Sequence, residues 1–467
     1  MSPLIATFVY GFAIYILFAL EREKGRKISP VLYIPALYLF TNGSRPLAFW
    51  LGMQSGDAAA LTQEGSPLDV LVALGLMIAG IVVLMKRQAA IARLLQANAA
   101  VMPFLMYCAI SCSWSDDPII AFKRWFRFLG TFITVLVILT DSDPSRALKW
   151  ALTRVGFLLI PISVLLIKYY PWIARSYDPW TGRQMVSGVA TDKNMLGMVC
   201  LVTGLPAVVQ LLSVWQERKR RGVRRVIAFG LIVAATIYLL SLADSMTSLM
   251  CFYMGCFVIV AMTLVKAARK SILVHLMVFG IVGAAFSVLF LHIGASGAMQ
   301  QLGRDTTFSG RTEIWAGLLR FAGSPLVGTG FDSFWVGDRL LRIWSAGGLL
   351  AGINEAHNGY LEMYLNLGWI GILFLAALIV IGYRNISLAL RSDREAAILR
   401  LAFFVVAIVY DFTEAGFRTG SSVWIAFLYA IWTAPRLRSR GQSPTRTSGG
   451  LQDSNSKTAG EVALKTA

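Results

Sequence analysis

The sequence predicts an all-α fold, a bundle of about 12–13 transmembrane helices with one long loop outside the membrane. Of the 467 residues, 57% are hydrophobic and 15% are charged, and the mean hydropathy is +0.65. Apolar runs recur at a length of roughly 20 residues, which crosses ~30 Å of hydrocarbon as a helix. One long polar stretch, residues 294–356, interrupts them. Unpaired backbone groups are costly in lipid, so this stretch must lie outside the hydrocarbon.

The apolar runs predict the following spans in chain order: residues 3–20, 30–52, 68–85, 94–113, 121–140, 151–170, 194–215, 224–241, 245–265, 271–293, 357–382, 399–411 and 419–434. Asn42-Gly43-Ser44-Arg45-Pro46 interrupts the second span and predicts a broken helix. We expect transmembrane helices 1–10 in residues 1–293, the loop in 294–356 and the C-terminal transmembrane helices in 357–434. Residues 435–467 have the composition of a disordered tail.

Positive charges fall in alternate loops, the distribution that marks cytoplasmic loops. The net charge is +18 at pH 7, but this alternation argues against a nucleic-acid-binding surface. The basic loops contain Lys27, Lys86, Arg146, Arg218 to Arg225, Lys266, Arg384 and Arg438. The N-terminus and the long loop are then outside and the C-terminus inside. No cleavable signal peptide is expected, because Met1 to Ala19 lacks a basic start.

The cysteines predict neither a metal site nor a disulfide. All five lie within or beside apolar runs, without CxxC spacing or neighbouring histidines: Cys108, Cys112, Cys200, Cys251 and Cys256. Packing is the expected role. The chain also has no Gly-rich phosphate loop, so we expect neither a metal nor a cofactor.

Arginines on the outer side indicate an anionic ligand. Arg45 lies in the broken second span, and Arg124 opens the fifth span beside Lys123 and Arg127. Ionisable residues in such positions usually face a cavity or a ligand. Further cations lie in the outer loops: Arg175, Arg183, Lys193, Arg304, Arg311, Arg320, Arg339 and Arg342. Long loops are exempt from the orientation rule, so these can equally be surface residues. Bidentate arginine–phosphate geometry favours a lipid diphosphate as the ligand.

His357 is the histidine best placed for catalysis. It lies where the long loop re-enters the membrane, between Glu355 and Glu362 and before a predicted helix. The helix N-terminus disfavours an imidazolium and the glutamates favour it, which predicts a base that titrates near neutrality. His275 and His292 lie near the two ends of the tenth span and are expected to be packing or interface residues.

Three motifs around the long loop resemble a known family. Phe308-Ser309-Gly310-Arg311-Thr312-Glu313-Ile314-Trp315, Gly328-Thr329-Gly330-Phe331 and Glu355-Ala356-His357-Asn358-Gly359-Tyr360-Leu361-Glu362 occur in that order. With Ser44-Arg45-Pro46, residues 188–197 and the Ser-rich turn 241–249, they resemble the O-antigen ligase and polymerase superfamily, in particular its exopolysaccharide polymerase branch. In the Ser-rich turn, relatives often carry a cation where this chain has Asp244 and Met246, which weakens any role of that turn in phosphate binding.

The resemblance implies a membrane glycosyltransferase of the bacterial inner membrane with its active site facing the periplasm. Such enzymes take undecaprenyl-diphosphate-linked glycan as donor and need no metal. The family's catalytic histidine corresponds to His357, with Glu355 or Glu362 orienting it and Glu355 preferred. Its diphosphate-binding arginines correspond to Arg311 and Arg183 and less closely to Arg304, Arg124 and Arg45. A chain-length regulator and a flippase are the partners that the family implies.

Three alternatives remain at this stage. An O-antigen ligase would move the glycan onto lipid A core with the same chemistry, although Ser44-Arg45-Pro46 and the wording of residues 308–315 favour a polymerase. A flippase or transporter also has broken helices and buried arginines, but the charges here gather at outer helix ends. A metal-dependent glycosyltransferase would need a carboxylate base. Asp116-Asp117 is the only adjacent outer acidic pair, and we interpret it as a helix-start turn.

Overall fold

The apolar runs fold as helices throughout the part of the chain that the computed structural model describes. These residues are 1–22, 28–53, 66–177, 182, 184–216, 222–265, 270–291 and 310–433. Within them, eight helices are long and apolar enough to span a membrane, or nine if the bent pair Gln88–Ala97 and Val101–Trp114 counts as one. An all-α polytopic membrane protein is therefore confirmed.

The remaining predicted spans are also helical. The fifth is α8 (Pro118–Leu139), a helix of 22 residues that carries three cations, Lys123, Arg124 and Arg127, and so is not among the eight. The second is broken into α2 (Tyr33–Asn42) and α3 (Leu47–Trp50), as the Gly43 to Pro46 segment predicts. The fourth bends by 91° between α6 (Gln88–Ala97) and α7 (Val101–Ser111). The last two are short, α19 (Arg394–Tyr410) with 17 residues and α20 (Ser422–Ile431) with 10.

Helices α9 (Pro144–Tyr169) and α11 (Lys193–Gln216) form the core of the unit Met1–Ala434. α11 packs against α9, α19, α20, α12 (Gly222–Ala243) and α13 (Met246–Leu264). In the apolar windows of α9 and α11, 72% of the residues are buried. The corresponding value is 11% for α1 (Pro3–Glu21) and α14 (Ser271–Phe290). In a bilayer these two helices would present most of their apolar surface to lipid.

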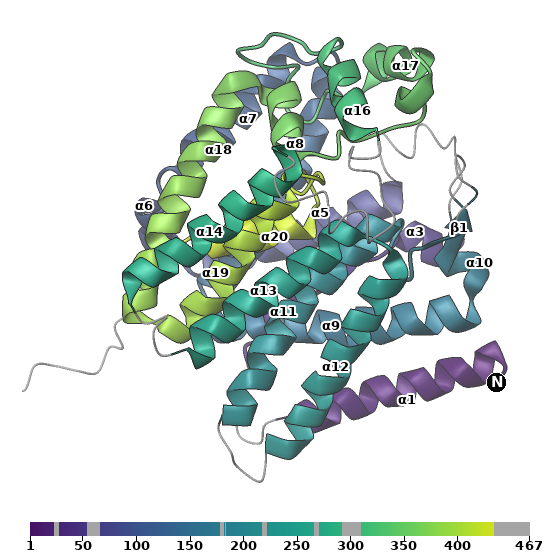
Figure 1. Cartoon of the computed structure of the whole chain (residues 1–467), viewed down its shortest axis with the longest axis vertical. Coiled ribbons are helices and arrows are strands. Elements are labelled where there is room, and N and C mark those ends of the chain that lie inside the picture. The colour runs from purple at the N-terminus through teal and green to yellow at the C-terminus, as the bar shows by residue number, and fades with distance from the viewer. Residues whose placement is uncertain are drawn as a thin grey trace, which may run out of the picture. The chain divides into compact units, whose positions relative to one another are not determined.

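Figure 1 shows this core together with the remaining described elements. They are α5 (Pro67–Met85), α8 (Pro118–Leu139), α10 (Pro171–Ala174), α16 (Arg311–Leu319), α17 (Gly337–Ser345), α18 (Gly359–Ser392) and the antiparallel strands β1 (Arg175–Tyr177) and β2 (Gln184–Val186). Short 3-10 helices in the described residues cover Pro30–Leu32, Cys112–Trp114 and Gly348–Leu350.

The described part of the long loop has its own small hydrophobic core. Helices α16 and α17 lie together at the top of Figure 1. Their buried side chains pack with the segment before α18, in a cluster of Ile314, Leu318, Phe334, Trp335, Leu340, Ile343, Ala356 and Leu365. The loop is therefore a folded cap on the first turns of α18 in residues 310–358.

The loop is joined to α18 through the backbone. Gly368 interrupts α18 with φ 64°, and the loop segment 324–330 fills the break. Trp369 N–H donates to Pro325 C=O, and Thr329 N–H donates to Leu365 C=O. A Cβ on Gly328 would collide with the backbone of Asn366, and one on Gly368 with Leu326. Only glycine allows both the left-handed φ and this approach.

Candidate catalytic site

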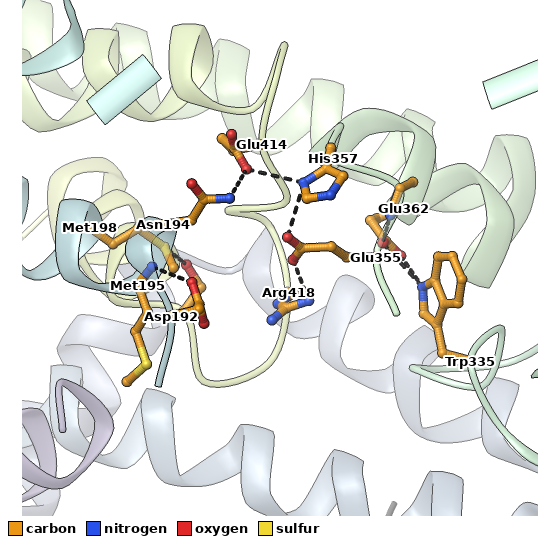
Figure 2. Close-up of polar contacts among 12 residues, drawn as sticks. Asp192, Asn194, Met195, Met198, Trp335, Glu355, His357, Glu362, Glu414 and Arg418 are labelled. Atoms are coloured by element: carbon orange, nitrogen blue, oxygen red, sulfur yellow. Dashed lines mark hydrogen bonds and ion pairs between the residues drawn. The ribbon is translucent and has the colours of Figure 1, made fainter. Parts of the chain in front are cut away.

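His357 lies in a fixed backbone position at the start of α18. Its φ is 49°, in the left-handed region that costs most residues about 1 kcal/mol or more. Asn358 follows as the N-cap, and its side-chain oxygen accepts from the N–H groups of Tyr360 and Leu361. Figure 2 shows that the imidazole points from this turn toward Glu355 and Glu414.

Both backbone polar groups of Ala356, the residue before His357, are hydrogen-bonded to side chains. Its N–H donates to Glu362 Oε1 at 2.6 Å, and its carbonyl accepts from Trp315 Nε1 at 2.8 Å. Glu362 is 4% exposed and also accepts from Trp335 Nε1 at 2.9 Å. Figure 2 shows that Glu362 points to Trp335 and not to the imidazole. Glu362 thus positions the backbone that carries His357.

Two carboxylates share one nitrogen of His357 (Figure 2). Nδ1 lies 3.0 Å from Glu355 Oε1 and 3.3 Å from Glu414 Oε2. Glu355 comes from the same segment, whereas Glu414 comes from the loop between α19 and α20. Within the described residues, Nε2 has no hydrogen-bond partner. The carboxylates favour the tautomer with the proton on Nδ1, which leaves the Nε2 lone pair available.

Arginines pair with the same two carboxylates. Arg418 Nη1 lies 2.7 Å from Glu355 Oε2, and Arg311 Nη2 lies 2.8 Å from Glu414 Oε1. Arg311 also donates to the carbonyl of Thr413. We call His357, Glu355, Glu414, Arg311 and Arg418 the charged cluster. With a protonated histidine it carries one net positive charge, which suits an anionic ligand.

Buried polar contacts position the loop that supplies Glu414 and Arg418. Asp411 is 0% exposed, and its Oδ1 accepts from Phe417 N–H at 2.6 Å. Its backbone carbonyl accepts from Gly359 N–H at 2.9 Å, which joins the loop to α18. Asn194 Nδ2, on α11, donates to Glu414 Oε2 at 3.0 Å. The loop that carries Glu414 is thus held by α11 through Asn194 and by the start of α18 through Gly359.

The cluster holds the two titratable groups in their charged forms. Burial opposes the charge of His357, but hydrogen bonds and charges of Glu355 and Glu414 outweigh it and raise the pKa of His357 to about 9. Burial likewise opposes ionisation of Glu355, yet Arg418, His357 and Arg311 lower its pKa to about 2. The pKa of His357 lies above the near-neutral value expected from the sequence, because the buried Glu414, and not Glu362, contacts the ring together with Glu355.

The side chains of Glu355, His357 and Glu414 lie close enough together to hold a metal ion. Their chemistry does not favour one, because each carboxylate already pairs with an arginine, and a cation between them would lie against two guanidinium groups. The arginines therefore disfavour a cation between these carboxylates.

The structure brings together only part of the predicted arginine set. Arg311 joins the cluster. Arg45 instead donates to Ile173 C=O at 2.7 Å and Ser187 Oγ at 2.8 Å, tying the broken second span to the segment after α9. Arg124 donates to Asp332 C=O at 2.6 Å. Arg183 and Arg304 lie outside the described residues.

Sequence reasoning missed Glu414, Arg418 and Asn194. Glu414 and Arg418 lie in a short turn between two apolar runs, 57 or more residues from His357. A carboxylate and a guanidinium in such a turn were the available signal, because charges at outer helix ends are rarely neutral for function. Asn194 lies within the 188–197 motif, but no pattern assigned it a partner.

Other sequence predictions concern structural contacts. Asp117 caps α8 by accepting from Ile120 N–H, so the acidic pair is a helix-start turn, and Asp116 pairs with Arg339 at 2.7 Å. His275 Nδ1 lies 2.5 Å from the hydroxyl of Tyr383, an interhelix contact, and His292 lies outside the described residues. Four of the five cysteines are buried and Cys256 is half-buried, which agrees with the expected packing role.

Arg311, Glu355 and His357 of the charged cluster lie in a segment that matches a protein family. Residues 195–376 match the model of the family described as O-Antigen ligase. The resemblance to the O-antigen ligase and polymerase superfamily is confirmed. The chain is also 25% identical over 346 residues to the "Exopolysaccharide production protein ExoQ" of Rhizobium meliloti (strain 1021), which covers 72% of this chain and 76% of that protein. These matches support a polysaccharide ligase or polymerase type of function.

Proposed function

We propose that this protein is a polysaccharide polymerase of the bacterial inner membrane. It would transfer glycan from an undecaprenyl-diphosphate-linked donor to an acceptor sugar hydroxyl at the periplasmic face. The observation that carries the proposal is His357 with Nδ1 held by two carboxylates, inside a cluster with two arginines. A polymerase is favoured over a ligase because the curated relative is named for exopolysaccharide production.

His357 acts as the general base. Its neutral form keeps the proton on Nδ1, bonded to Glu355 and Glu414, so that Nε2 takes the proton of the acceptor hydroxyl. The acceptor oxygen forms a bond to the anomeric carbon as the bond to the diphosphate oxygen breaks. Displacement from the opposite face inverts the configuration. No step requires a metal ion.

The arginines stabilise the leaving group. Negative charge develops on the undecaprenyl diphosphate as it departs, and a guanidinium already in place is worth most at that moment. Arg311 is the described arginine that fits this role, beside the base and on the family motif. Arg183 and Arg304 complete the proposed set from outside the described residues. Arg124 and Arg45 would have to exchange their present backbone partners to contribute.

The direct test is polymer formation by purified protein with a defined lipid-linked donor. We expect His357→Ala to lower the rate by ~10²–10⁴-fold, the usual contribution of a general base. His275→Ala, which removes a histidine from an interhelix contact on α14, is the matched control and should retain activity. Wild-type rates for His357→Ala would end the assignment.

The alternative function is an O-antigen ligase that transfers the glycan to lipid A core. The family description favours it, and the same cluster would serve. Surface polysaccharide of a deletion strain separates the two: loss of long chains with single repeats still exported supports a polymerase, and accumulation of long lipid-linked chains supports a ligase. A flippase would translocate the donor without forming a glycosidic bond, so product formation by purified protein would contradict it.

A further inference from the structure

Glu414 is the most connected side chain of the charged cluster. Its Oε1 pairs with Arg311 at 2.8 Å, while its Oε2 accepts from Asn194 at 3.0 Å and lies 3.3 Å from His357 Nδ1. The carboxylate is 5% exposed, against 17% for Glu355. One buried charge therefore contacts both the proposed base and the proposed diphosphate-binding arginine.

The contact with Arg311 has a consequence for ligand binding. The Arg311 side chain is 21% exposed, and the group that occupies its Nη2 is Glu414. A diphosphate oxygen that binds this guanidinium must replace or share that carboxylate. Like charges in one place repel, so Glu414 and an incoming diphosphate compete for Arg311.

We propose that Glu414 is a positioning residue that masks Arg311 in the free enzyme and takes it back after transfer, so that the polyprenyl diphosphate product is released. This inference rests on the proposed function, because it requires that Arg311 binds the diphosphate. The donor and the product carry the same diphosphate, so an uncompensated Arg311 would hold both. Glu414 sets a limit on that affinity and at the same time keeps His357 in place.

Several charged groups lie near His357, and Glu414 differs from the other carboxylates in its partner. Among the described residues, Glu355 on its own segment and Glu414 on the loop after α19 contact the imidazole, and Arg418 and Arg311 pair with the other oxygens of these carboxylates. Glu362 on α18 binds the Ala356 peptide. Of the two carboxylates on Nδ1, Glu414 is the one paired with Arg311.

The test measures binding of farnesyl diphosphate and inorganic diphosphate to the full-length protein in detergent, together with steady-state polymerisation. Glu414→Gln keeps the size of the side chain and removes its charge. We expect both probes to bind roughly five- to tenfold more tightly, the effect of losing one half-buried competing ion pair. The kcat should fall, and the pH at which kcat/KM levels off should drop by about one unit, because one carboxylate no longer stabilises the imidazolium. A purely structural role would instead weaken binding.

Three further variants make the outcome decisive. Glu313→Gln removes an exposed carboxylate two residues after Arg311 and should leave binding unchanged. Glu414→Asp is the substitute variant if Glu414→Gln does not fold. It retracts the carboxylate from Arg311 and should tighten binding about twofold. In an Arg311→Ala background, Glu414→Gln should no longer tighten binding.

The failure of each proposal has its own result. If Arg311→Ala binds both probes as tightly as the wild type, the diphosphate role of Arg311 in the proposed function is wrong. If Arg311→Ala weakens binding but Glu414→Gln does not tighten it, masking by Glu414 is wrong and the proposed function stands. If Glu414→Gln tightens binding of farnesyl diphosphate but not of inorganic diphosphate, the effect depends on the prenyl chain and not on the diphosphate. This result also contradicts masking.

Discussion

Glu362 accepts a hydrogen bond from the N–H of Ala356 at 2.6 Å, six residues earlier in the chain. The same carboxylate accepts from Trp335 Nε1, so one buried glutamate links the loop, the turn before His357 and the first turn of α18. The position of the imidazole therefore depends on a residue that does not touch it.

Glu362→Ala should lower kcat by at least about tenfold, because an unsatisfied buried donor costs ~1–3 kcal/mol and the turn before His357 would relax. The affinity for farnesyl diphosphate should change by less than about twofold, since the Arg311 contacts do not involve Glu362. Glu362→Gln keeps one acceptor oxygen, so its kcat should lie between those of the wild type and Glu362→Ala. Equal losses of kcat and affinity in the Ala variant would contradict a role limited to the base.

The pH dependence of kcat/KM follows from the raised pKa of His357. The active base is the neutral form, so a pKa of about 9 means that kcat/KM rises with pH and levels off near pH 9. The opposite sign applies to stability: ion pairs of His357 stabilise the fold fully below pH 6.5 and lose this contribution as the pH rises through 9. Rate profiles and thermal midpoints between pH 6 and 10 test both, and a rate that falls over this range would rule out His357 as the base.

Gly328→Ala and Gly368→Ala should each reduce the thermal midpoint by several degrees, because both positions have positive φ and a Cβ would meet the opposing backbone. Gly283→Ala is the control, as its Cβ would have no neighbour within 4 Å on α14. Thermal unfolding of purified protein measures the difference. Unchanged stability in both variants would mean that the loop and α18 are not joined as described.

Arg45→Gln should lower thermal stability and leave the affinity for farnesyl diphosphate unchanged. The Arg45 guanidinium donates to Ile173 C=O and Ser187 Oγ and lies over the ring of Phe49, so its contacts are structural. Arg311→Ala is the contrasting variant, for which weaker binding is expected. Weakened binding by Arg45→Gln at unchanged stability would return Arg45 to the diphosphate site.

The fold class and the contact between Glu355 and His357 could be predicted from the sequence because the signals are local. Apolar length defines the helices, and Glu355 contacts His357 from two residues away. Gly368 could not be anticipated as a break, because it lies within the continuous apolar run 357–382 and only the opposing loop backbone reveals its role.

The charge network could not be predicted because it depends on contacts across the sequence. Glu414, Arg418 and Asn194 reach the cluster through the packing of α11, α18 and α19. Arg45 shows the converse limit: a guanidinium in an apolar helix can serve a ligand or backbone carbonyls, and residue type alone does not distinguish them.

The backbone junction between segment 324–330 and α18 has a consequence for engineering. Backbone hydrogen bonds fix the loop segment against α18, so the two segments should be exchanged together. A chimera that exchanges residues 310–336 between relatives while keeping the host α18 would bring together backbones that never matched. Exchange of residues 310–392 as one block keeps both sides of the junction together, so we expect such a chimera to fold more stably.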